Sequence, residues 1–196
     1  NMHIPLYRTI KILASSYKRQ QSLNHLTKGW ELNQIRQDLL HGEYNDWIKY
    51  YCSLPLKNKV VLDIGAGEGE SPCFFIYHGA KTVIAVEPDE IAFKNLSYNA
   101  EHHSFIALKE YLSTTLLDKW LPKVDVVKID VEGYEEQLLD YNITKPIVLE
   151  IHGLQLAEKF VAKGYTLFEN KYPLGCATAS CNRMAHKNLS KRKQQK

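Results

Sequence analysis

The sequence predicts an α/β protein built on a mostly parallel sheet with flanking helices. Three observations point to this class. Between residue 58 and about residue 187, short apolar segments alternate with helical segments, as they do when helices connect parallel strands. The apolar run Val60–Leu62 leads directly into a glycine-rich turn. Acidic side chains stand at the ends of several expected strands, which is where open α/β sheets bind their ligands.

Seven segments have the length and apolar content of strands: Val60–Ile64, Thr82–Glu87, Phe105–Leu108, Val124–Asp130, Ile147–Ile151, Tyr165–Glu169 and Asn182–His186. A helix follows the glycine-rich turn, and we expect Ser71 to cap its start and Gly79 to end it. Another helix is expected from Pro88 to about Asn99, with Asp89 well placed as its cap. A third follows Gly133 and carries Tyr134, Leu138 and Tyr141 on one face.

The 196 residues are enough for one domain and an appendage. We divide the chain into a helical N-terminal appendage over residues 1–57, which is a candidate substrate lid, an α/β domain over 58–187, and a basic tail over 188–196. Within the appendage, Gly29 and Gly42 are expected to interrupt the helices and Pro55 to end them.

The net charge of +3 is too small to indicate a polyanionic partner for the whole chain. Basic residues nevertheless gather near the C-terminus, at Lys187, Lys191, Arg192, Lys193 and Lys196. Such a run is most often a solvated tail and less often an RNA contact. The sequence contains no long apolar run typical of a membrane span and no visible signal peptide. Of the four cysteines, Cys176 and Cys181 lie close in sequence, which is a weak metal signal, and we expect a cytoplasmic protein.

The segment from Asp63 to Glu70 is the most informative stretch of the chain. Its glycines at 65, 67 and 69 depart from the dinucleotide pattern G-x-G-x-x-G, which would require glycine where Glu70 stands. A carboxylate at the start of a helix disfavours a pyrophosphate there. The loop therefore predicts a nucleoside ligand without phosphates, such as S-adenosylmethionine.

The acid at the end of the second strand fits the same ligand. Glu87 lies 22 residues beyond Gly65, the spacing at which a carboxylate accepts hydrogen bonds from the two ribose hydroxyls. The alternative is that Glu87 caps the next helix, a role for which Asp89 is better placed.

Several segments resemble the class I S-adenosylmethionine-dependent methyltransferases. They are Val61–Gly67, Ala85–Pro88 and Val127–Glu135. The phrase Lys128–Gly133, together with Val148–His152, resembles more narrowly the FkbM-type branch of that class. The resemblance implies a Rossmann-like sheet of order 3-2-1-4-5-7-6 with an antiparallel last strand.

Carried over residue by residue, the resemblance implies a binding site for S-adenosylmethionine along the strand ends. Glu87 would hold the ribose, and the residues after the third strand would meet the adenine. The implied set is Asp63, Gly65, Ala66, Gly67, Glu68, Gly69, Glu87, Pro88, Asp89, Leu108, Lys109 and Asp130.

The catalytic candidates are Asp130, Glu132, Glu150 and His152, at the ends of the fourth and fifth strands. Asp130 is expected beside the transferred methyl, where it could take a proton or orient the acceptor. Alternatively, the four residues together could bind Mg²⁺ or Mn²⁺, which would lower the pKa of an acceptor hydroxyl. In a purely structural interpretation, Glu132 caps the following helix and Glu150 pairs with Lys128.

Three functions follow from this reading. The first is O-methylation of a hydroxyl on a small molecule or sugar, which the FkbM-type resemblance favours. The second is methylation of an RNA ribose, suggested by the basic tail, although the Lys-Asp-Lys-Glu set of such enzymes is not recognisable. The third is a non-catalytic module that binds the cofactor.

Overall fold

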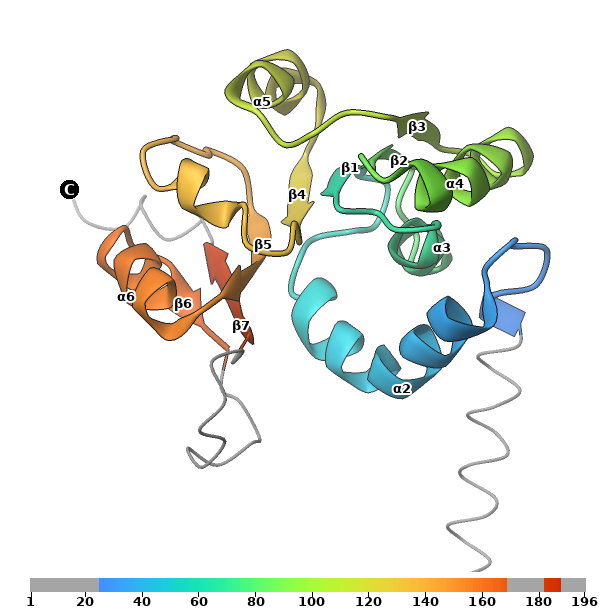
Figure 1. Cartoon of the computed structure of the whole chain (residues 1–196), viewed down its shortest axis with the longest axis horizontal. Helices are drawn as coiled ribbons and strands as arrows, with labels where there is room; N and C mark the ends of the chain where they lie inside the picture. Colours follow the sequence, from blue (N-terminus) through green and yellow to red (C-terminus); the bar gives the residue numbers. More distant parts are fainter. Residues whose placement is uncertain (1–24, 169–181, 188–196) are drawn as a thin grey trace, which may run out of the picture.

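The computed structural model describes residues 25–168 and 182–187. Its centre is a seven-stranded sheet of order β3-β2-β1-β4-β5-β7-β6 (Figure 1). The strands are β1 Val60–Ile64, β2 Thr82–Val86, β3 Ile106–Leu108, β4 Val126–Ile129, β5 Ile147–His152, β6 Thr166–Leu167 and β7 Asn182–Lys187. β7 runs antiparallel to both of its neighbours, whereas the pairs from β3 to β5 are parallel. The predicted sheet and strand order are confirmed.

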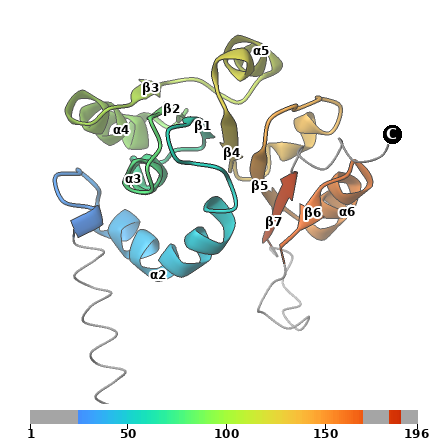
Figure 2. The same ribbon diagram turned by 180° about the vertical axis from the view of Figure 1, so that it is seen from behind.

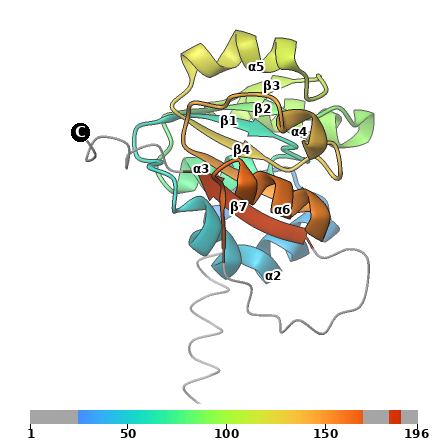
Figure 3. The same ribbon diagram turned by 90° about the vertical axis from the view of Figure 1, so that its left-hand side faces the viewer.

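The sheet separates two apolar cores, because successive side chains of a strand point to opposite faces. On β1, Val61 packs into one core, whereas Leu62 and Ile64 pack into the other. The first core holds Phe74 and Leu96 from the helices on its side. Figure 3 shows the resulting layers, with α5 on one side of the sheet and α2 and α3 on the other.

Five α-helices lie wholly within the described residues: α2 Gln34–Tyr51, α3 Glu70–Tyr77, α4 Glu90–His102, α5 Thr114–Trp120 and α6 Leu154–Ala162. Two short 3₁₀ turns, η1 Leu121–Lys123 and η2 Glu135–Leu138, accompany them. α4 and β3 lie at one end of the sheet, and α6 lies with β6 and β7 at the other, as Figures 1 and 2 both show. Asp89 caps α4 as predicted, with its carboxylate accepting from two backbone N–H groups.

Several local predictions were wrong. Ser71 does not cap α3, because the helix begins two residues earlier than expected, directly after Gly69, and the Ser71 hydroxyl donates instead to Asp63. The helix expected after Gly133 is the single turn η2, and Tyr134 beside it is exposed rather than packed. Gly133 has a φ of +97°, which a right-handed helix cannot contain.

The described part of the appendage contains one long helix, α2, which covers the sheet. α2 runs straight through Gly42, which was expected to interrupt it, and ends before Pro55. Trp47 and Tyr51 are buried and make edge or tilted contacts with the ring of Phe74 on α3. The remaining parts of the predicted organisation lie outside the described residues: the first 24 residues of the appendage, Cys176, Cys181 and the tail over 188–196. In the described part of the chain, no helix is long and apolar enough to cross a membrane.

Candidate functional site

A cavity of about 500 Å³ opens at the carboxyl ends of the central strands. It is lined by Ile64, Gly65, Glu87, Pro88, Tyr111, Leu112, Asp130, Val131, Glu132, Tyr134 and Gln137. These residues follow β1, β2, β3 and β4, so four neighbouring strands contribute to a single cavity. Its volume is in the range that binds small molecules and cofactors.

The glycine loop offers no free backbone donors to a ligand. Its five consecutive amides each have a partner inside the protein: Gly65 and Ala66 donate to Val86, Gly67 to Glu87, Glu68 to Glu70, and Gly69 to Ala66. Phosphate-binding loops work through the opposite arrangement, in which successive N–H groups point at the anion. The geometry therefore fits a ligand without phosphates at this end of the cavity.

Glu87 is the acid that faces the cavity from β2. Its two carboxylate oxygens accept from Gly67 N and Asp89 N, each at 2.9 Å. Two amide donors fix the carboxylate in place, and each oxygen retains a lone pair for a further donor. A vicinal diol supplies two such donors.

Gly65 is required by the close approach of two strand ends. A Cβ at this position would lie 1.6 Å from the carbonyl oxygen of Asp130, and the backbone φ of +79° also favours glycine. The loop after β1 and the loop after β4 thus touch at the floor of the cavity. This contact places the glycine loop directly against Asp130.

Asp63, predicted to contact the cofactor, does not line the cavity. Its carboxylate is fully buried, accepts from the Ser71 hydroxyl at 2.6 Å and lies 3.1 Å from the ammonium of Lys128. Lys128 also donates to the Gly65 carbonyl at 2.6 Å and lies 3.8 Å from Asp130. Burial would lower the pKa of Lys128, but the charges of Asp63 and Asp130 raise it, so the ammonium stays charged.

Glu68 and Glu70 face the appendage rather than the cavity. Glu68 accepts from the backbone and side-chain amides of Asn33, the residue that caps α2. Glu70 pairs with Arg36 of α2 at 3.0 Å, and its own side chain is buried. The acids of the glycine loop therefore bind the N-terminal end of α2 to the loop.

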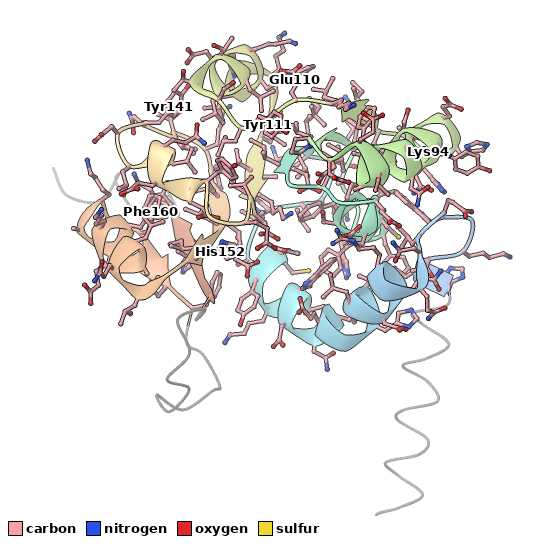
Figure 4. The ribbon with its side chains drawn as sticks, viewed as in Figure 1. Lys94, Glu110, Tyr111, Tyr141, His152 and Phe160 are labelled. Atoms are coloured by element: carbon pink, nitrogen blue, oxygen red, sulfur yellow. The ribbon has the colours of Figure 1, made fainter. Side chains whose placement is uncertain are left out.

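The rim beyond β3 differs from what the sequence suggested. Lys109 pairs with Glu90, and neither Lys109 nor Leu108 lines the cavity. Tyr111 and Leu112 line it instead. Tyr111 lies on the segment between β3 and α5, and Figure 4 labels it together with His152. The sequence signal that was overlooked is an aromatic residue, Tyr111, three positions beyond the end of β3.

A second group of polar residues lies at the ends of β4 and β5. Asp130, Glu150 and His152 each offer one ligand atom, and these atoms lie within 4.8 Å of one another. The structure thus brings together three of the four predicted catalytic residues. Glu132, the fourth, is largely exposed, but one of its oxygens lies 3.2 Å from Nε2 of His152. Lys128 pairs with Asp63 and Asp130.

His152 is held by an acid that sequence reasoning did not select. Glu135, fully buried in η2, lies 2.7 Å from Nδ1 of His152 and also accepts from Gly133 N at 3.0 Å. Burial would lower the pKa of His152, but the hydrogen bond and charge of Glu135, with the charges of Glu150 and Glu132, raise it.

The backbone after β4 is unusual at two successive residues. Glu132 has a φ of +49°, although it has a side chain, and Gly133 follows at +97°. Such left-handed residues cost energy and concentrate at functional sites. Here they turn the chain so that Glu132 reaches His152 from outside while Glu135 reaches it from the core. The expected helix-capping role of Glu132 does not occur, since η2 has no side-chain cap.

Comparisons with known proteins identify solved structures that share this fold. No protein-family model matches the chain, and no curated protein matches it. A solved structure from Pyrococcus horikoshii, provisionally described as an RNA methyltransferase, superposes with a TM-score of 0.52 at 18% identity and covers 87% of this chain and 96% of its own. A provisional rRNA methylase from Clostridium thermocellum gives a TM-score of 0.52 at 16% identity, covering 74% of this chain and 93% of its own.

A third solved structure, provisionally described as a hemolysin from Streptococcus thermophilus, gives a TM-score of 0.53 at 14% identity and covers 74% of this chain and 63% of its own. At these identities the likeness concerns the fold. The chain has the Rossmann-like fold that the methyltransferases among these neighbours share.

Proposed function

We propose that this protein is an S-adenosylmethionine-dependent methyltransferase that acts on a hydroxyl group. One observation carries the proposal. The cavity at the strand ends pairs a fixed carboxylate, Glu87, with a glycine loop whose amides are all engaged within the protein. This combination favours a ribose and disfavours a phosphate. S-adenosylmethionine is a nucleoside with no phosphate, and the fold supports the same choice.

In this proposal the cofactor lies along the rim from β3 to β4. Its ribose hydroxyls donate to Glu87, while Tyr111 and Leu112 flank the base and Gly65 allows the methionine end to pass close to the backbone. Asp130 then lies on the side of the transferred methyl. The sulfonium would not encounter a cation there, because Lys128 is buried beneath Asp63 and Asp130.

Methyl transfer needs an aligned acceptor and one proton acceptor. The hydroxyl oxygen forms a bond to the methyl carbon, the carbon–sulfur bond breaks with its electron pair passing to sulfur, and S-adenosylhomocysteine leaves as a neutral thioether. The hydroxyl proton passes to a carboxylate at the ends of β4 and β5, where Asp130, Glu132 and Glu150 are candidates and His152 is a further base.

The acceptor we favour is a small molecule or sugar, as the FkbM-type resemblance of Lys128–Gly133 and Val148–His152 indicates. An RNA ribose is the second candidate, and the descriptions of two structural neighbours support it. Both acceptors present a hydroxyl oxygen, so the chemistry at Asp130 is the same. The non-catalytic alternative is less well supported, because the polar groups at β4 and β5 are intact.

Calorimetry tests the cofactor directly. We expect S-adenosylhomocysteine to bind the full chain with 1:1 stoichiometry and NAD⁺ to show no measurable heat at the same concentration, because the pyrophosphate finds no backbone donors in the loop. Tight NAD⁺ binding would overturn the proposal. Transfer of radiolabelled methyl to fractionated metabolites or to RNA then separates the two acceptor classes, and transfer to neither would favour the non-catalytic module.

A further inference from the structure

We propose that Asp130, Glu150 and His152 form a divalent-cation site that takes Mg²⁺ or Mn²⁺ and receives the acceptor hydroxyl. The role of the site in catalysis rests on the proposed function, whereas cation binding itself does not. Of the four residues that the sequence suggested as ligands, the structure groups these three.

The spacing of the ligand atoms fits one ion. The three atoms lie within 4.8 Å of one another. In an octahedral site with bonds of about 2.1 Å, ligand atoms lie roughly 3.0 Å apart when adjacent and roughly 4.2 Å apart when opposite. A shift of about 1 Å in the side chains therefore suffices for all three to bind together. Two carboxylates with one imidazole suit Mg²⁺ or Mn²⁺ better than a softer metal.

His152 is prepared to act as a ligand through Nε2. Its Nδ1 faces the fully buried carboxylate of Glu135 at 2.7 Å, so Nδ1 carries the proton and Nε2 of the neutral ring presents its lone pair. A carboxylate behind a ligating imidazole is the usual second layer of a metal site. Glu135 is thus a positioning residue for His152.

Two polar atoms of the group lack partners. Nε2 of His152 and Oδ1 of Asp130 are buried, and neither has a hydrogen bond within residues 25–168 and 182–187. The other oxygen of the fully buried Glu135 is likewise unpartnered. Buried polar atoms normally find a partner, so these exceptions indicate that something else binds here.

Nε2 also lies 3.2 Å from an oxygen of Glu132 without a hydrogen bond between them. Two atoms that each present a lone pair at this distance require positive charge beside them, either a proton on Nε2 or a metal ion.

The excess of negative charge around these residues also favours a bound cation. Five carboxylates meet around this group: Asp63, Asp130, Glu132, Glu135 and Glu150. The ammonium of Lys128 lies closest to Asp63 and forms its longer contact with Asp130. Lys128 therefore compensates the side next to the glycine loop. A divalent cation at His152 would compensate the side next to β5.

The cation supplies one function that the side chains do not. A hydroxyl oxygen bound to the ion has a lowered pKa, so it loses its proton more readily. With Asp130, Glu150 and His152 as ligands, the proton passes to Glu132, the exposed carboxylate beside His152, and from there to water. The oxygen then attacks the methyl carbon as the carbon–sulfur bond breaks, as described above.

The test is direct binding of Mn²⁺ to the full chain. Binding is measured as the decrease of the free Mn²⁺ signal in electron paramagnetic resonance. We expect one Mn²⁺ per chain. His152→Gln and Asp130→Asn should each weaken binding at least 10-fold, and Glu135→Gln should weaken it about 10-fold by releasing the imidazole. The matched control is His102→Gln, because His102 is exposed on α4 and contacts Tyr98 within the same helix. It should bind Mn²⁺ as the unaltered protein does.

Binding of S-adenosylhomocysteine and circular dichroism, measured on the same samples, show that each variant is folded. Absence of Mn²⁺ binding at millimolar concentration, or equal binding by His152→Gln and the unaltered protein, would overturn the cation site. The two proposals fail separately. A protein that binds S-adenosylhomocysteine but not Mn²⁺ would overturn the cation site alone. A protein that binds Mn²⁺ but not S-adenosylhomocysteine would overturn the proposed function alone.

Discussion

The polar residues that follow the central strands are paired differently on the two sides of the sheet's carboxyl edge. On the side formed by the ends of β1 and β2, Glu68, Glu70 and Glu87 each accept hydrogen bonds from protein N–H groups. On the side formed by the ends of β4 and β5, Asp130 and His152 keep buried atoms without a hydrogen-bond partner among the described residues. On the first side Glu68, Glu70 and Glu87 are already hydrogen-bonded within the protein, so a ligand can bind Glu87 without supplying charge. The second side requires a partner from outside.

The largest effect should come from the contact that joins the two sides. Gly65→Ala places a Cβ 1.6 Å from the Asp130 carbonyl and holds alanine at a φ of +79°. We expect it to lower the free energy of unfolding by about 3 to 5 kcal/mol, as measured by urea denaturation. A loss below about 1 kcal/mol would mean that the two loops do not pack as described.

Gly42→Ala is the matched control for this substitution. Gly42 lies within α2, and a Cβ there meets nothing within 4 Å. Alanine should therefore raise the free energy of unfolding by about 0.5 to 1 kcal/mol, because it favours the helix and restricts the unfolded chain. A large loss at Gly42 would instead indicate that α2 does not form as described.

A smaller effect is expected at the ribose-facing acid. Glu87→Gln keeps the size of the side chain but replaces one acceptor oxygen by a donor and removes the charge. We expect binding of S-adenosylhomocysteine to weaken 10- to 100-fold in calorimetry, about 1.4 to 2.8 kcal/mol. Glu101→Gln, on an exposed position of α4, should leave the affinity unchanged. Equal affinities for the two variants would place the ribose elsewhere.

The sheet was predictable because its signals are local. Strands buried on both faces contain short continuous apolar runs, such as Val60–Leu62 in β1 and Val83–Val86 in β2. Asp89 marks the start of α4, because aspartate is a strong helix cap. Helices α5 and α6 were missed. The cap of α5, Ser113, opens only two turns of helix without a terminating glycine, and the residue before α6 is a glycine, which has no side chain to cap it.

The candidate site was predictable in its members but not in their pairing. Asp130, Glu150 and His152 stand at strand ends, so their proximity follows from parallel pairing. Glu135 lies inside a segment whose predicted helix does not form, and its turn toward His152 depends on the left-handed backbone at Glu132 and Gly133. The partners of Glu68 and Glu70 come from α2, about 35 residues away, a distance that sequence patterns do not bridge.

The smallest effect should come from removing the ion pair that joins the glycine loop to α2. Arg36→Met removes the partner of Glu70, which is buried, while Arg36 itself is 37% exposed. We expect the free energy of unfolding at pH 7 to fall by about 1 to 2 kcal/mol, less than for a fully buried pair because solvent screens the arginine. Lys59→Met, which breaks an exposed pair with Asp125, should cost under about 0.5 kcal/mol.

The pH dependence of the Arg36→Met loss identifies its cause. Burial raises the pKa of Glu70 in the folded protein, and Arg36 partly opposes that rise. A raised carboxyl pKa means that the folded state holds the proton more tightly than the unfolded chain, so ionisation costs stability as the pH increases. Arg36 reduces this cost. Its removal should therefore matter most near pH 7 and progressively less as the pH falls through the raised pKa of Glu70. Little of the loss should remain at the ordinary glutamate pKa of about 4.3, where Glu70 is already largely protonated in both folded proteins. A loss that stays constant from pH 7 to pH 4 would instead assign the effect of Arg36 to packing of its aliphatic stem on α2.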